Sequence, residues 1–250
     1  MSNISPIDGR YKKNVSELET FFSEQALMRH RVMVEVEYLL ALIEHRSFQK
    51  TRALSKKTLN SLKGLYVEFS ADHFKQIKKI EKKTNHDVNA VVVFVSEKLK
   101  KLGRGDLVPF VHFGLTSEDI NNISYSLMTQ GAVEGVMIPS VKRVLKELKA
   151  LSKKTKSLSL LSLTHGQPAT TTTLGKELAV FVSRVEREIA LIKKMKLLAK
   201  LSGATGSYAA HRVAFPDFNW PLFSKRFIKK LGLEQSPICL LYTSPSPRDY

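Results

Sequence analysis

The sequence has few of the residues that hold small secreted proteins together or bind structural metals. Its 250 residues include one cysteine, Cys239, which excludes an internal disulfide framework and fits a reducing compartment. No cysteines and histidines share the spacing of a zinc site, so we expect no metal. The N-terminus lacks the apolar segment of a signal peptide, and the longest apolar run, residues 90–95, is too short to span a bilayer. These absences predict a cytoplasmic protein without a membrane partner.

Positive charge is abundant. There are 40 Lys and Arg against 23 Asp and Glu, which gives a net charge of +17. Such an excess suits nucleic acid, anionic membranes or anionic small molecules. The lysines occur mostly as pairs, for example Lys78-Lys79 and Lys193-Lys194, and such pairs are typical of solvated helix faces. Aromatic residues are not interleaved with them as in nucleic-acid-binding surfaces, so we expect no nucleic-acid partner.

The apolar residues recur with a helical period along most of the chain, which predicts an all-α fold. Ser16 to Glu19 has the spacing of a capping box and predicts the start of the first long helix. The further predicted helices cover 55–69, 71–81, 88–102, a segment around 141–151, 174 to about 201, and part of 216–233. Glycines at 103 and 105 predict a boundary between an N-terminal helical domain (1–108) and the first part of a long-helix bundle domain (109–237).

Two polar motifs in the N-terminal part are candidate binding segments. In the first, Pro6 and Asp8-Gly9 predict a turn that is followed by Arg10 and Tyr11, a pair able to hold a phosphate and cover a ring. The second, 84–88, contains Asn85, His86 and Asp87 at a predicted helix start. There a capping role for Thr84 or Asn85 and a binding role for the three residues both stay open.

Two further motifs carry hydroxyl groups and a histidine. Thr116 to Asp119 again has capping-box spacing, and a helix N-terminus with the hydroxyls of Thr116 and Ser117 can bind a carboxylate. The segment 164–169, Thr-His-Gly-Gln-Pro-Ala, places His165 in a tight turn, because Gly166 and Pro168 interrupt a helix. An imidazole held in one direction with a pKa near 7 suits a general acid, although a structural histidine is the alternative.

The last residues differ from the rest of the chain. Residues 239–249 have no helical period and resemble, residue for residue, one reading frame of a transposase adapter used in sequencing libraries. We therefore interpret residues 238–250 as a non-native read-through tail and exclude them from the predicted fold.

Taken together, the four motifs resemble the adenylosuccinate lyases, a family within the fumarase/aspartase superfamily. The resemblance covers Ser5 to about Pro237 and implies elimination of fumarate from adenylosuccinate and from the related succinyl-carboxamide ribotide of purine synthesis. It further implies a homotetramer, a nucleotide substrate and no cofactor. It assigns the general acid to His165. The residues that would bind substrate are Arg10, Tyr11, Asn85, His86, Asp87, Thr116 and Ser117.

The resemblance also defines what the sequence lacks. The family's catalytic base is a serine in a mobile loop ahead of a Met-Pro-x-Lys-x-Asn-Pro stretch, and no such stretch occurs here. We therefore expect a fragment that is inactive and poorly stable as written. Three alternatives stay open: another fumarate-releasing lyase such as argininosuccinate lyase, a basic helical nucleic-acid-binding protein, and a non-catalytic homologue.

Overall fold

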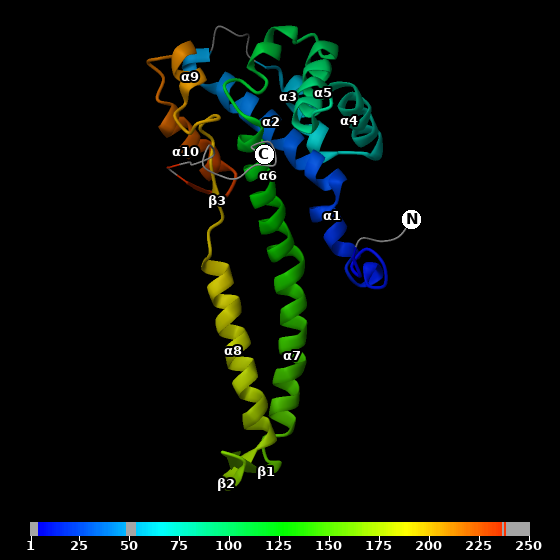
Figure 1. The fold of residues 1–250 in the computed structure, drawn as a ribbon, viewed down its shortest axis with the longest axis vertical. Helices are drawn as coiled ribbons and strands as arrows, with labels where there is room; N and C mark the ends of the chain where they lie inside the picture. The colour runs from blue at the N-terminus through cyan, green and yellow to red at the C-terminus, as the bar shows by residue number, and fades with distance from the viewer. Residues whose placement is uncertain (1–4, 49–53, 237, 239–250) are drawn as a thin grey trace, which may run out of the picture. The chain divides into compact units, whose positions relative to one another are not determined.

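A computed structural model describes residues 5–48, 54–236 and 238 of the chain (Figure 1). The described residues within Met1–Gln130 and Leu197–Tyr250 form one compact unit, and Gly131–Lys196 form the other. Both are mainly helical, as the sequence predicts. The domain boundaries predicted at residues 108 and 237 stay predictions, and the predicted read-through tail lies outside the described residues except for Ile238. Among the described residues, no helix is long and apolar enough to cross a membrane.

The first unit holds most of the helices. In chain order its elements are η1 (Lys12–Asn14), η2 (Ser16–Leu18), α1 (Glu19–Phe22), α2 (Glu24–Glu44), η3 (Arg46–Phe48), α3 (Lys56–Val67), α4 (Ala71–Thr84), α5 (Asp87–Lys101), η4 (Gly105–Phe110), α6 (Ser117–Ala132), β3 (Leu198–Ala199), α9 (Ala209–Ala214), α10 (Trp220–Lys230) and β4 (Glu234–Gln235). Strands β3 and β4 form a short parallel pair.

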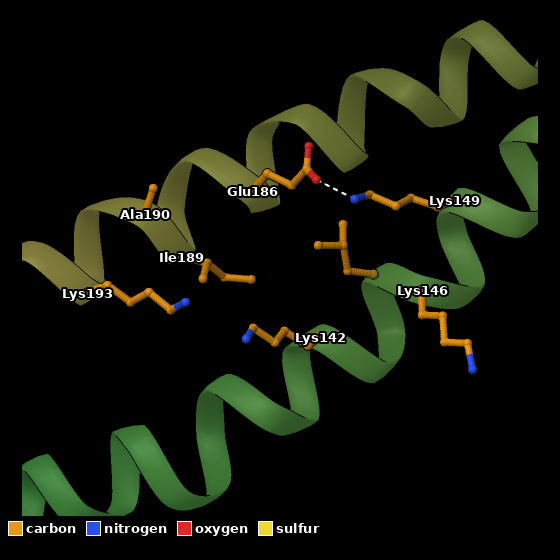
Figure 2. Close-up of a pocket in the computed structure, with 8 residues that line it drawn as sticks. Lys142, Lys146, Lys149, Glu186, Ile189, Ala190 and Lys193 are labelled. Carbon is orange, nitrogen blue, oxygen red and sulfur yellow. Dashed lines mark ion pairs between the residues drawn. The ribbon is translucent and has the colours of Figure 1, made fainter.

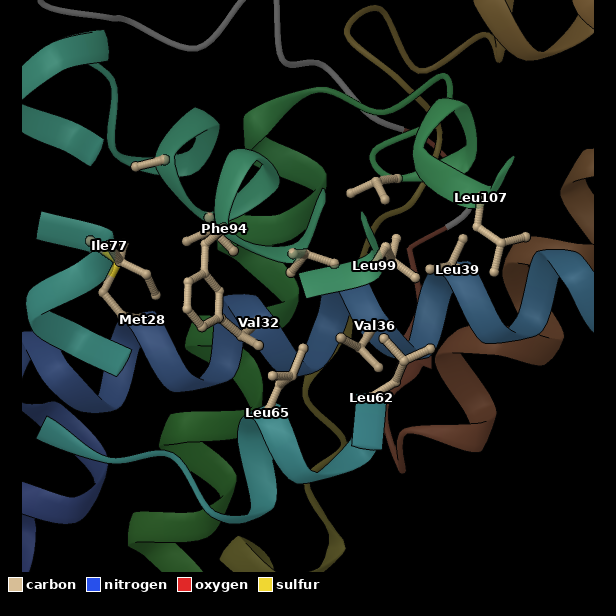
Figure 3. Close-up of a cluster of buried hydrophobic side chains, with 14 of the residues drawn as sticks. Met28, Val32, Val36, Leu39, Leu62, Leu65, Ile77, Phe94, Leu99 and Leu107 are labelled. Atoms are coloured by element: carbon tan, nitrogen blue, oxygen red, sulfur yellow. The ribbon is translucent and has the colours of Figure 1, made fainter. Parts of the chain in front are cut away.

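Helix α2 is the centre of this unit because it is buried on more than one side. One side faces α3, α4 and α5 in a buried cluster that includes Met28, Val32, Val36, Leu39, Leu62, Ile77, Phe94 and Leu99 (Figure 3). The other side contributes to a second cluster that includes Val34, Tyr38, Leu42, Ile120, Trp220 and Phe227. A helix that is apolar on opposite sides is expected in the interior of a domain.

The start of α2 differs from the prediction. Ser23 is extended (ψ 158°), and its side chain accepts a hydrogen bond from the Ala26 N–H at 3.1 Å, so Ser23 is the N-cap. The capping box predicted at Ser16 is wrong, since Ser16 lies within η2 and its hydroxyl donates to the Lys13 carbonyl. The buried side chains begin only at Ala26. Burial therefore favours a helix start at Ser23 over one at the capping-box pattern of Ser16, seven residues earlier.

The second unit is an α-helical hairpin. It contains the π-helical turn η5 (Val133–Met137), α7 (Ile138–Lys154), β1 (Ser159–Thr164), β2 (Gln167–Thr173) and α8 (Leu174–Lys194). Figure 1 shows α7 and α8 side by side, with the two strands at one end. The helices approach closely at Gly175, where a Cβ would clash with the Ser152 carbonyl oxygen. Their shared core contains Ile138, Leu145, Val182 and Ile189.

Two features of this region were not predicted. Residues 159–173 form an antiparallel β-hairpin, in which Thr164 pairs with Gln167. The helix predicted to reach about Leu201 ends at Lys194, because Met195 is extended (ψ 133°). Beyond it, Ala199 and Leu201 are buried in the first unit, so the apolar residues that suggest a longer helix belong to a different core.

Replacing Ser23 by alanine tests the observed cap. We expect Ser23→Ala to lower the free energy of unfolding by about 1 kcal/mol, since the Ala26 N–H loses its acceptor. The control, Ser16→Ala, should change it by less than about 0.5 kcal/mol. Urea unfolding followed by circular dichroism measures both, and an equal loss in the two variants would contradict the assigned helix start.

Candidate active site

The Asn85–Asp87 motif forms the corner between α4 and α5. Asn85 adopts the left-handed conformation (φ 50°) and ends α4, a conformation that asparagine tolerates better than most residues. His86 is the N-cap of α5, and its Nδ1 accepts from the Asn89 N–H at 3.2 Å. The neutral ring therefore carries its proton on Nε2. Of the two roles left open for this motif, capping is observed, but the N-cap of α5 is His86, whereas Asn85 is the C-cap of α4 and Thr84 is the last residue of α4.

The Thr116–Asp119 motif begins helix α6, as predicted. The Asp119 carboxylate accepts from the Thr116 N–H at 2.9 Å, which is half of the expected capping box. Asp119 is fully buried and also accepts from the N–H groups of Ser202 and Gly203, at 3.0 and 3.1 Å. Its ion pair with Lys200 (3.0 Å) completes the set. One carboxylate thus fixes the helix start against the segment 200–203.

Asn122, one turn further along α6, strengthens the same connection. Its side-chain oxygen accepts from the Lys200 N–H at 2.8 Å, and its amide donates to the Lys200 carbonyl at 3.1 Å. This pairing copies the hydrogen bonds between adjacent strands. Because the backbone N–H and C=O of Lys200 are both held, the segment 200–203 has a defined distance from Thr116 and Ser117.

Arg31 on α2 joins the two motifs, and the sequence analysis did not select it. The side chain is 3% exposed. Its NH2 group pairs with Asp87 Oδ2 at 2.7 Å, and its Nε donates to Asn121 Oδ1 at 2.9 Å. Burial by itself raises the pKa of Asp87, but Arg31 and the Val88 N–H outweigh burial, so the pKa of this carboxyl is lowered. A buried arginine therefore sets the distance between the Asn85–Asp87 corner and the first turns of α6.

The two remaining predicted sites lie in other parts of the chain. The turn at Pro6 to Gly9 is present, and the Arg10 guanidinium lies 5.7 Å from the centre of the Tyr11 ring. His165 belongs to the second unit, where it is exposed at the tip of the β-hairpin. His165 (φ 49°) and Gly166 (φ 74°) are the two central residues of the turn and both are left-handed, which matches a type I′ hairpin turn.

Two further histidines near α6, the partly buried His112 and the buried His211, were also missed. His112 Nδ1 lies 2.5 Å from the Oε1 of fully buried Glu35. Burial acts to lower the pKa of His112, but the Glu35 carboxylate outweighs it, and the pKa is raised. His211 packs against Gly114, where a Cβ would lie 2.7 Å from the ring at φ +68°. Each is a single residue outside the four motifs, so no local pattern marks them.

His211 is held in one orientation by Tyr38. The Tyr38 hydroxyl donates to the Phe113 carbonyl (2.7 Å) and lies 3.2 Å from His211 Nε2. Since the Tyr38 proton is used, His211 Nε2–H is the donor to the hydroxyl oxygen, and its Nδ1 has no partner among the described residues. Burial lowers the pKa of His211 to about 4, so the ring is neutral at physiological pH.

The groups gathered in the first unit can bind an anionic ligand. Within the described residues, no group of His, Cys, Asp and Glu side chains could hold a metal ion. The N-terminal end of α6 carries partial positive charge and the hydroxyls of Thr116 and Ser117. The His86 imidazole lies at the neighbouring corner. These groups suit recognition of carboxylate or phosphate oxygens.

Removing Arg31 tests the bridge between the motifs. We expect Arg31→Met to lower the free energy of unfolding by about 1.5–3 kcal/mol at pH 7, because Asp87 and Asn121 lose a charged donor. The pKa of Asp87 should rise. Because the pKa of Asp87 is lowered in the folded state, the stabilisation from its ion pair is fully present above the pKa of the unfolded state. This stabilisation is lost as the pH falls through the pKa of the folded state. The advantage of the wild type should therefore shrink below about pH 4.

Carboxyl NMR titration of Asp87 and urea unfolding at several pH values measure these effects. Arg29→Met, on the same helix and half-buried, is the control and should leave the Asp87 titration unchanged. If Arg31→Met also leaves it unchanged, the ion pair does not form in solution.

The low pKa of His211 predicts a second pH effect. The unfolded ring takes up a proton near pH 6.5 and the folded ring only near pH 4, so stability should fall across this interval as the pH decreases, by about 3 kcal/mol at most. His211→Gln should be less stable at pH 7 and should lose less stability between pH 6.5 and 4. Urea midpoints against pH measure this slope, and identical slopes in the two proteins would exclude the assignment.

The chain is similar in sequence to known proteins. Residues 9–242 match the model of a protein family described as Lyase. The adenylosuccinate lyase of Escherichia coli (strain K12) is 39% identical over 251 residues, which cover 100% of this chain and 54% of that protein. The adenylosuccinate lyase of Dictyostelium discoideum is 42% identical over 236 residues, which cover 92% and 51%. The chain spans about half the length of the curated relatives it matches.

Solved structures extend the likeness to the fold. The crystal structure of a fumarate lyase from Mesorhizobium sp. BNC1 matches with a TM-score of 0.68 at 19% identity, over 89% of this chain and 49% of that one. The β-carboxy-cis,cis-muconate cycloisomerase of Acinetobacter calcoaceticus sp. ADP1 matches with a TM-score of 0.66 at 20% identity, over 89% and 50%. Since the family model covers nearly all of the sequence, the chain belongs to this lyase family.

Proposed function

We propose that the complete protein eliminates fumarate from adenylosuccinate, giving AMP, and cleaves the related succinyl-carboxamide ribotide in the same way. The observation that carries this proposal is the Arg31 bridge, which holds the Asn85–Asp87 corner near the first turns of α6. A substrate with a nucleotide at one end and a succinyl group at the other needs two such anchoring points. The likeness to adenylosuccinate lyases, over the whole of this chain, supports this choice of substrate.

The residues take complementary roles in this reaction. Arg10 and Tyr11 bind the phosphate and ring of the nucleotide, together with the Asn85–Asp87 motif. Thr116 and Ser117 bind a carboxylate of the succinyl group at the helix N-terminus. A base removes a proton from the succinyl carbon, the carbon–nitrogen bond breaks, and His165 donates its proton to the departing nitrogen. The products are fumarate and the free amine.

The catalytic base is expected in the half of the relatives that this chain does not match. We therefore expect this chain alone to be inactive and the complete protein to act as a cytoplasmic homotetramer without a cofactor. Neither a nucleic-acid partner nor a membrane partner is needed for this chemistry, which uses small anionic substrates.

A chimaera tests the proposal. Residues 1–236 are fused to the C-terminal half of the Escherichia coli adenylosuccinate lyase, and the loss of adenylosuccinate is followed by ultraviolet absorbance. We expect turnover by the chimaera and none by the chain alone. His165→Gln in the chimaera should lower kcat by about 10²- to 10⁴-fold, as for loss of a general acid. Arg10→Ala should mainly raise KM, because it removes a contact made before and during the reaction.

The control, His45→Gln, changes an exposed histidine outside the four motifs and should keep kcat within about twofold. Turnover of argininosuccinate instead would identify another fumarate-releasing lyase. A folded chimaera that is inactive on both substrates would indicate a non-catalytic homologue.

A further inference from the structure

The N-terminus of α6 is capped by a carboxylate and not by the hydroxyl that precedes the helix. In a complete capping box the Thr116 hydroxyl would accept from the Asp119 N–H. Here the Asp119 N–H donates to the Thr116 carbonyl at 3.0 Å, and the Asp119 carboxylate accepts from the Thr116 N–H at 2.9 Å. Within the part of the chain that the structure describes, no group is hydrogen-bonded to the hydroxyls of Thr116 and Ser117. The described fold therefore leaves both hydroxyls unused.

Other helices of the same chain are capped in the ordinary way. The hydroxyls of Ser23, Ser55 and Thr173 precede α2, α3 and α8, and each accepts from the backbone N–H three residues further on. Such a hydroxyl is sufficient to stabilise a helix start. Thr116 holds the same position before α6, yet its hydroxyl is not used. Helix stability alone therefore does not explain why a buried carboxylate caps α6.

The Asp119 carboxylate is fully occupied by groups of the first unit. One oxygen, Oδ2, accepts from the N–H groups of Thr116 and Gly203, and the other, Oδ1, accepts from the Ser202 N–H and pairs with Lys200. Each oxygen thus has two donors, which is the number that its lone pairs can accept. The side chain is also fully buried. Asp119 can therefore influence a ligand only through the groups that it holds.

Lys200 balances the charge of this cap. Its Nζ lies 3.0 Å from Asp119 Oδ1 and also donates to the Gly203 carbonyl at 2.6 Å. A carboxylate without a counter-ion at the start of a helix would repel an anionic ligand at the same place. Because the ammonium group lies beside the carboxylate, the cap is neutral as a whole. The partial positive charge of the helix N-terminus is then still available to a carboxylate.

Burial distinguishes this ion pair from those on helix faces. Lys149 and Glu186 in the second unit form a pair between half-exposed side chains (Figure 2). Such pairs contribute little to stability, whereas breaking a buried pair leaves a charge without compensation. In the pair of Asp119 with Lys200, the side chains are 0% and 8% exposed. The first unit therefore strongly favours the arrangement in which the carboxylate caps α6.

We propose that Asp119 is a positioning residue for the lyase reaction, which keeps the Thr116 hydroxyl free to bind a carboxylate of the succinyl group. By accepting from the Thr116 N–H, the Asp119 side chain replaces the cap that the hydroxyl would otherwise supply. It also fixes the direction of the Thr116 backbone, and with it the position of the hydroxyl. This inference rests on the proposed function, because it names the residue that prepares the proposed carboxylate site.

A double-mutant cycle in the chimaera tests the proposal. Thr116→Ala and Asp119→Asn should each lower kcat/KM by about tenfold or more, mainly through KM. In Asp119→Asn the amide nitrogen faces N–H donors and cannot accept from them, so the Thr116 hydroxyl is no longer relieved of capping. Because Asp119 acts through this hydroxyl, the two losses should not multiply. The double variant should be within about threefold of the weaker single variant.

Leu62→Ala is the control for a purely structural effect. It opens a cavity in the cluster around α2 and lowers stability without touching the polar motifs. At a temperature where it is folded, it should keep KM within about twofold of the parent value. Its effect on kcat/KM, whatever its size, should multiply with that of Thr116→Ala, because the two sites are independent. Urea unfolding of each variant measures the loss of stability separately from the kinetics.

Circular dichroism verifies that the variants fold. If Asp119→Asn is unfolded, hydrogen exchange of the wild-type chain labelled with ¹⁵N-threonine replaces the cycle. The Thr116 amide should then exchange at least about 100-fold more slowly than an unstructured amide, because its acceptor is buried. Fast exchange of this amide would overturn the proposal, since Asp119 would not cap the helix in solution.

Losses that multiply in an active chimaera would also overturn it, because Asp119 would then act independently of the Thr116 hydroxyl. That outcome leaves the proposed function intact. A folded parent chimaera without turnover has the opposite meaning: it would contradict the proposed function, and the role of Asp119 would fall with it.

Discussion

The described part of the first unit depends on one buried cation. Arg31 lies within the central helix, and its side chain is almost fully buried. It needs Asp87 and Asn121, which come from two helices distant in sequence. Burying a charge is costly unless its hydrogen bonds are satisfied, so the arrangement with both partners in place is favoured over alternative packings. The contacts of Arg31 therefore both stabilise the first unit and set the spacing of the two polar motifs.

Other polar side chains on α2 follow this rule. Glu35 meets His112, and Glu37 accepts from the Tyr66 hydroxyl at 2.7 Å and pairs with Lys230 at 3.2 Å. Apolar contacts tolerate small slides between helices, whereas these contacts have defined partners and directions. Charges in the middle of an apolar helix thus fix its rotation and register relative to its neighbours.

Features that depend on residues close together in the sequence could be predicted, and features that depend on residues far apart could not. The helix predicted at 55–69 agrees with α3 within two residues at each end, since apolar spacing and the Ser55 cap are local signals. The β-hairpin was missed because threonines 170–173 have no apolar alternation to mark a strand. Of the candidate site, the motifs could be selected, but Arg31, His112 and His211 could not. Their partners lie tens of residues away, and only folding brings them together.

The turn at His165 has a consequence for protein redesign. Its two central residues are left-handed, and asparagine followed by glycine is the favoured pair for such a turn. A procedure that optimises stability alone would therefore favour His165→Asn and improve the hairpin while deleting the imidazole. A histidine in this left-handed conformation is less favourable for the hairpin than an asparagine would be. Consensus or stability-guided engineering of this chain should hold that position fixed.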